Sequence, residues 1–138
     1  MPYKVTKSEL NYYAGFFDGE GCIMITKERA DRHRTLEVAI TSTRLKVLEG
    51  FKLAFGGRVY GAVKGKGHYK SKWQWTIGAN LARAFLEAVY PYLRLKKQEA
   101  ELAMEFQRAR IYRRNSLLKA GREAIEEAQY IIMKGLKK

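Results

Sequence analysis

The segment YYAGFFDGEG, residues 12–21, constrains the fold of this chain more than any other stretch of its sequence. It places three glycines and two carboxylates inside a pattern that otherwise indicates an apolar helix from residue 9 to about 19. Gly15 and Gly19 are four residues apart and share one face of such a helix. Because glycine destabilises a helix by about 1 kcal/mol relative to alanine, this spacing favours close packing against a second helix. A helix end that needs flexibility would account for Gly19 and Gly21, but not for Gly15.

Glu20 ends that helix, between two glycines and just before a strand that begins at Cys22. The helix dipole favours cations at a helix C-terminus, so a carboxylate in this position suits a bound metal. Two such carboxylates, brought together across paired helices, would form an oxygen-rich site for Mg²⁺. That arrangement serves two-metal hydrolysis of a phosphodiester. The alternative for an acidic residue between glycines is an ordinary turn.

The periodicity of the apolar residues predicts one α+β domain over residues 1–138, with a core of about 8–110 and a helical tail of about 111–138. Alternating apolar residues predict two hairpins, each followed by a helix. The expected order begins with a helix, a hairpin over 22–42 and a second helix ended by the glycines at 56 and 57. Strands near 58–64 and 69–77 follow, and then a helix from 80 that stops before Pro91. From 96 onward we expect two basic amphipathic helices, broken around 115–116.

The charge of the chain indicates a polyanionic partner. Lys and Arg number 27 against 14 Asp and Glu, a formal net charge of +13, and residues 22–77 hold 12 of the basic and 4 of the acidic residues. Nucleic acid is the leading partner, with a merely solvated surface or anionic lipid as alternatives.

No apolar run is long enough to span a membrane, and the first residues lack the apolar core of a signal peptide. Two histidines and one cysteine are too few for a zinc cluster. The lone cysteine also excludes an internal disulfide, so we expect an intracellular protein. Its compartment would be the cytoplasm of a prokaryote, or an organelle or the nucleus of a eukaryote.

Four strands with one apolar and one basic face are typical of a sheet laid on DNA. A two-stranded ribbon fits the major groove, where base edges are distinguishable. The commoner alternative is an ordinary antiparallel sheet with a solvated face. Alternation places Ile23 and Ile25 on the apolar face, and Val59 and Val63 likewise. The candidate contacts to bases or phosphates are Met24, Thr26, Glu28, Arg32, Arg34, Tyr60, Lys64, Lys66, Lys70, Lys72 and Gln74. Three of these, Arg32, Arg34 and Lys66, are expected in hairpin turns, where phosphate contacts are as frequent as base contacts.

Residues 13–21, YAGFFDGEG, resemble the motif of the LAGLIDADG homing endonucleases, with Ala14, Gly15, Asp18 and Gly21 identical and an acidic residue at position 20. The glycine pair after the middle helix, the W-x-W strand and PYLRLKKQEAEL are also similar to segments of that family, and the resemblance covers residues 10 to about 107. It implies an αββαββα fold with a saddle-shaped antiparallel sheet, here with a helical C-terminal extension.

The resemblance also implies roles for particular residues. Single-motif members of the family are homodimers that bind double-stranded DNA. The resemblance therefore implies a dimer interface on the motif helix, formed by Tyr13, Ala14, Gly15, Phe17 and Asp18. Within this set it implies a structural role for Asp18. It implies Mg²⁺, or another divalent cation such as Mn²⁺, bound by Glu20 with Gly19. Lys96 corresponds to a basic residue near the active site that supports the water network or the transition-state charge, with a surface lysine at a helix start as the alternative.

Two departures from the family pattern stand out. The first is Glu20, which is one methylene longer than the common aspartate. The second lies after the second strand, where relatives have a glutamine and this sequence has Thr41, Ser42 and Arg44. No single residue is therefore assigned to position the attacking water. Arg44 could face the scissile phosphate.

The leading hypothesis is a site-specific double-strand endonuclease, intron- or intein-associated, acting on a long pseudo-palindromic target. The alternatives are an RNA splicing maturase or a non-catalytic DNA-binding regulator on the same scaffold, or a general RNA-binding protein. A carboxylate at position 20 would repel phosphate in a protein that only binds, which favours the nuclease. The tail after residue 110 could contact DNA through its basic residues or support the dimer through its apolar ones.

Overall fold

The computed structural model describes residues 5–27, 34–67, 69–116 and 119–137. The predicted order of helices and hairpins is confirmed. The elements are α1 (Lys7–Glu20), β1 (Gly21–Lys27), β2 (Arg34–Ser42), α2 (Leu45–Phe55), β3 (Arg58–Val63), β4 (Lys72–Gly78), α3 (Ala79–Val89), the 3-10 helix η1 (Tyr90–Tyr92), α4 (Lys97–Ser116) and α5 (Lys119–Leu136). Since α4 runs through residue 110, no break in secondary structure marks the predicted boundary between core and tail.

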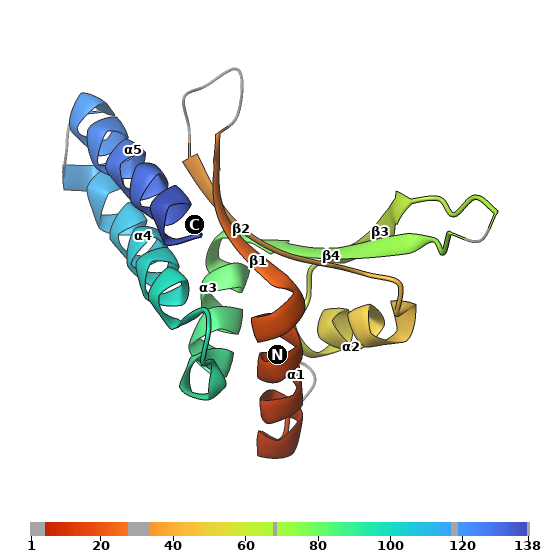
Figure 1. Cartoon of the computed structure of the whole chain (residues 1–138). Coiled ribbons are helices and arrows are strands. Elements are labelled where there is room, and N and C mark those ends of the chain that lie inside the picture. Colours follow the sequence, from red (N-terminus) through yellow and green to blue (C-terminus); the bar gives the residue numbers. More distant parts are fainter. Residues whose placement is uncertain (1–4, 28–33, 68, 117–118, 138) are drawn as a thin grey trace.

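The four strands form one antiparallel sheet in the order β1-β2-β4-β3. Figure 1 shows α1, α2 and α3 on one face of this curved sheet, with α4 and α5 packed side by side at its β1–β2 end. Register confirms the predicted parity of the first hairpin, because Ile23 pairs with Val38 and Ile25 with Leu36, and all four side chains are buried. The opposite face of the sheet, called the open face below, is not covered by α1, α2 or α3.

An aromatic cluster holds the helices against the sheet. The ring of Trp75 in β4 lies 5.0 Å from that of Phe51 in α2 and 5.2 Å from that of Phe85 in α3. Its indole Nε1 donates a hydrogen bond of 2.8 Å to the carbonyl of Gly56, just after α2. Gly57 follows with φ of +89°, and a Cβ there would overlap the carbonyl oxygen of Thr76. The glycine pair predicted to end the helix therefore also allows a close approach of β4 to the chain.

The second hairpin differs from its prediction at its tip. A register shift between Gly61 and Val63 pairs Val63 with Lys72, and Val63 is 57% exposed. The prediction that Val63 shares the apolar face was wrong, because a β-bulge reverses the alternation at this point. Lys64 and Lys70 were predicted within strands, but the strands end at residue 63 and begin again at 72, so both lie in the connection.

Candidate active site

The end of α1 passes directly into β1. The N–H of Gly21 donates to the carbonyl of Phe17, which makes Gly21 the C-cap of α1 as well as the first residue of the strand. A Cβ at Gly21 would overlap the ring and the carbonyl oxygen of Phe17. Glu20 is therefore the last helical residue, and its side chain is exposed. Carbonyls in a last helical turn lack intrahelical donors, so that of Gly19 is available beside the carboxylate of Glu20.

The carboxylate of Asp18 joins α1 to the start of α4. It accepts backbone hydrogen bonds from Arg94 at 2.7 Å, from Leu95 at 2.9 Å and from Lys96 at 2.9 Å. Burial by itself would raise the pKa of this carboxyl, but the hydrogen bonds from Leu95, Arg94 and Lys96, together with the charge of Lys96, outweigh burial and hold the pKa below its ordinary value. Asp18 thus fixes the segment that leads into α4 against the last turn of α1.

Lys96 lies at the same end of α1 as Glu20. Its Nζ donates a hydrogen bond of 2.6 Å to the backbone carbonyl of Asp18, two residues before Glu20. The C-terminal carbonyls of a helix carry partial negative charge, which explains why an ammonium binds there. The location that the sequence indicated for Lys96 agrees with this contact, and its part in the chemistry stays a prediction.

Arg44 stands at the start of α2, with an exposed side chain and a backbone N–H that donates to Ser42 Oγ at 3.0 Å. The register places Ile40 opposite Gly21, so the end of β2 that leads to Arg44 begins beside the end of α1. No measured contact joins Arg44 to Glu20, and its catalytic role also stays a prediction. Thr41, next to Ile40, is exposed on the open face and donates a hydrogen bond of 3.4 Å to Gln74 Oε1.

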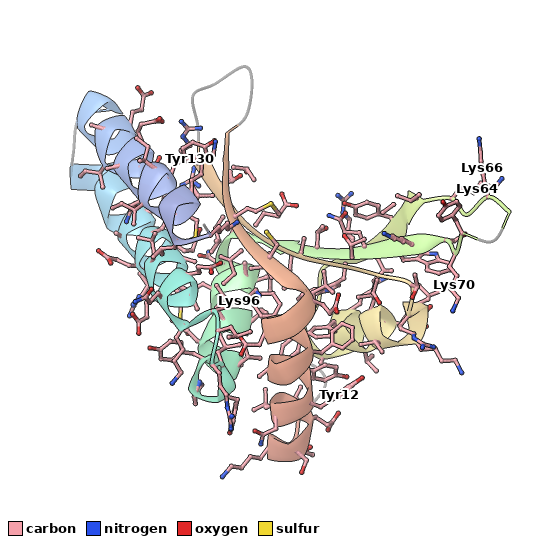
Figure 2. The ribbon with its side chains drawn as sticks, in the orientation of Figure 1. Tyr12, Lys64, Lys66, Lys70, Lys96 and Tyr130 are labelled. Carbon is pink, nitrogen blue, oxygen red and sulfur yellow. The ribbon has the colours of Figure 1, made fainter. Side chains whose placement is uncertain are left out.

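The register assigns the predicted DNA contacts to several places. The open face of the sheet carries Met24, Thr26, Tyr60, Lys72 and Gln74. Three lysines, Lys64, Lys66 and Lys70, extend from the β3–β4 connection, which projects beyond the body of the protein (Figure 2). Glu28 and Arg32 lie outside the described residues.

Arg34 corrects one prediction. It was expected in a turn, but it is the first residue of β2, on the core side with Leu36, and only 3% exposed. Its guanidinium is ion-paired with Glu127 and lies 4.2 Å from the ring centroid of Tyr130, both in α5. A side chain held in this way cannot reach DNA on the open face.

A model of the family described as LAGLIDADG endonuclease matches residues 13–112 of the chain. The chain belongs to the LAGLIDADG endonuclease family. Among solved structures, it is similar to the homing endonuclease I-CvuI in complex with its target, with a TM-score of 0.74, 16% identity, and coverage of 94% of this chain and 82% of that one. It is also similar to an archaeal intron-encoded homing endonuclease complexed with DNA, with a TM-score of 0.76, 15% identity, and coverage of 95% and 85%. At such identities these likenesses show the fold. A search of curated proteins finds no match.

The motif helix of this LAGLIDADG chain has a different exposed face from the one that the resemblance implied. Ala14 and Phe17 are completely buried and Asp18 is 8% exposed, all inside the protomer, so their prediction as interface residues was wrong. Tyr13 also packs inward, with its ring 4.6 Å from that of Phe51. Only Gly15 of the predicted set is exposed.

The exposed stripe of α1 runs along Asn11, Tyr12, Gly15, Gly19 and Glu20. A Cβ at Gly15 or Gly19 would meet nothing within 4 Å, so these glycines serve no packing need within the protomer. Their position agrees with the sequence argument that a second helix approaches this face.

Sequence reasoning missed further polar residues on the open face. Glu37 pairs with Met24, and Arg58 pairs with Thr76 while its guanidinium lies 5.6 Å from the ring centroid of Tyr60. Alternation within each strand could have found both, because Arg58 shares the parity of Tyr60, and Glu37 lies between the apolar residues Leu36 and Val38. Within the described ranges, no three His, Cys, Asp or Glu side chains gather as a metal cluster, and no helix is long and apolar enough to cross a membrane.

Proposed function

We propose that this protein is a site-specific double-strand DNA endonuclease that works as a homodimer with a divalent metal. The observation that carries the proposal is the exposed Glu20, which ends α1 and leads without a loop into β1 of a sheet whose open face carries polar and basic side chains. Family membership supports the nuclease. The complexes of I-CvuI with its target and of the archaeal enzyme with DNA support duplex DNA as the partner.

The oxygen donors at the end of α1 suit a hard cation. The carboxylate of Glu20 and the carbonyl of Gly19 would hold Mg²⁺ or Mn²⁺, which prefer carboxylate, carbonyl and water oxygens. Such an ion, when bound, supplies activation of water and stabilisation of the leaving oxygen. One protomer contributes one Glu20, so a second copy, packed along Gly15 and Gly19, would bring a second carboxylate to the same place.

The other residues position the reacting groups. Lys96, fixed to the carbonyl of Asp18, holds positive charge at the end of α1 where negative charge develops on the scissile phosphate. Arg44, exposed after β2, would contact a neighbouring phosphate. The two-fold axis of a dimer would present the same open face to two half-sites, which implies a long pseudo-palindromic target.

The proposal is tested with a plasmid that carries the host locus without the reading frame or any surrounding intron. Wild type should linearise the plasmid in Mg²⁺ but not in EDTA. Glu20→Gln should bind with similar affinity and cut about 100-fold more slowly or worse, since even outer-shell partners of a metal cost 10–100-fold. Glu49→Gln, the same change at an exposed site on α2, is the matched control and should cut like wild type.

Two outcomes would contradict the proposal. Tight binding without cutting by wild type would make the scaffold a recognition module, as in a maturase or a regulator. Equal cutting by Glu20→Gln and wild type would remove Glu20 from the metal site.

A further inference from the structure

The C-terminal end of α5 reaches the open-face side of β1. A cavity of about 370 Å³ lies between them, lined by Met24, Ile25, Thr26, Tyr130, Met133, Lys134 and Lys137. Met24 and Thr26 are open-face residues by register. Figure 1 shows the end of α5 beside β1. The surface available to a ligand on the open face therefore continues onto α5.

Both lysines of this cavity are exposed, and each makes a contact that holds its side chain in place. Lys134 Nζ lies 4.7 Å from the ring centroid of Tyr130, a cation–π contact. The same ring is fixed by Arg34, which is itself buried and paired with Glu127. Lys137 Nζ lies 3.3 Å from Sγ of Cys22, two residues after Glu20.

The acidic groups near this end of the protein do not cancel the two ammonium groups. Glu127 is paired with Arg34, and Glu126 lies 3.9 Å from the guanidinium of Arg110. Glu37, opposite Met24, is the one carboxylate that the register places on this part of the open face among the described residues. The helix dipole accounts for a lysine in the last turn of α5, but not for two lysines laid against β1.

We propose that the end of α5 is part of the nucleic-acid-binding surface, with Lys134 and Lys137 contacting backbone phosphates of a duplex that lies on the open face. Tyr130 is a positioning residue that holds Lys134 in the required place. These contacts are sequence-independent, because they recognise phosphate rather than base edges. The inference rests on the proposed function and extends the DNA-binding surface to an element that lies outside the two hairpins.

The test measures how binding of a labelled, arbitrary-sequence duplex of about 30 base pairs depends on salt. Each phosphate contact contributes about 0.9 to the slope of log K against log salt. Lys134→Gln with Lys137→Gln should therefore reduce the slope by about 1.8 per protomer. The matched control is Lys7→Gln with Lys52→Gln, because both lysines are exposed on helices that cover the other face of the sheet. The control should keep the wild-type slope.

Tyr130 is tested separately, with thermal unfolding used to show that each variant is folded. Tyr130→Phe keeps an aromatic face for Lys134 and should keep the slope, whereas Tyr130→Leu should lower it by up to about 0.9. If wild type binds duplex DNA and the double lysine variant keeps its slope, the inference is overturned while the proposed function stands. If wild type binds no duplex at all, the proposed function fails, and the inference fails with it.

Discussion

Replacing Asp18 by asparagine should destabilise the protein at neutral pH by about 2 kcal/mol. Both carboxylate oxygens of Asp18 accept backbone hydrogen bonds from the segment just before α4. Asparagine keeps one oxygen and turns an NH₂ group toward N–H donors. Hydrogen bonds to a charged group are worth about 1.5–3 kcal/mol each, so loss of the charge and of one acceptor should cost about 2 kcal/mol. For a domain of this size the melting temperature should fall by roughly 7 °C.

The pH dependence separates the charge of Asp18 from its shape. Because the pKa of Asp18 is lowered in the folded state, its stabilising contribution is complete above about pH 4–5 and is lost as the pH falls through the folded-state pKa. The difference in unfolding free energy between wild type and Asp18→Asn should therefore shrink toward about 1 kcal/mol or less in acid. Urea unfolding between pH 7 and pH 3 measures it, with Glu49→Gln as the exposed control. An equal difference at both pH values would refute the charge-based account.

Two glycine substitutions should have opposite effects. Gly15→Ala should leave the protomer as stable as wild type or up to about 1 kcal/mol more stable, because the added Cβ meets nothing. The same change should weaken the dimer. An unchanged dimer dissociation constant, measured by sedimentation, would argue against the proposed helix pairing. Gly57→Ala should destabilise the fold by about 3 kcal/mol or more, because φ is positive and the Cβ would overlap the carbonyl of Thr76. A decrease of less than about 1 kcal/mol in the free energy of chemical unfolding would contradict that geometry.

The order of the elements could be predicted because it depends on local patterns. Alternation in the first hairpin and the glycine pair at 56 and 57 both operate over a few residues, and the structure agrees with them. The motif itself located Glu20 at a helix end. These features needed no knowledge of which segments meet in space.

What the sequence could not predict depends on contacts between distant segments. Asp18 accepts hydrogen bonds from a segment more than 70 residues later in the chain, so its carboxylate lies inside the protomer rather than at the expected interface. Arg34 followed the inward parity of its strand, but a buried arginine is acceptable there only because α5 supplies Glu127 and Tyr130. The bulge before Val63 likewise needs the pairing with β4 to be recognised.

The shared role of Gly21 has a consequence for fidelity. Since this residue closes α1 and opens β1, no hinge separates the strand that would lie on DNA from the carboxylate that would hold the metal. A mismatched base pair that shifts β1 would shift Glu20 with it. Misalignment during recognition would then be passed to the chemical step as a loss of rate, so cutting would discriminate between sequences more sharply than binding does.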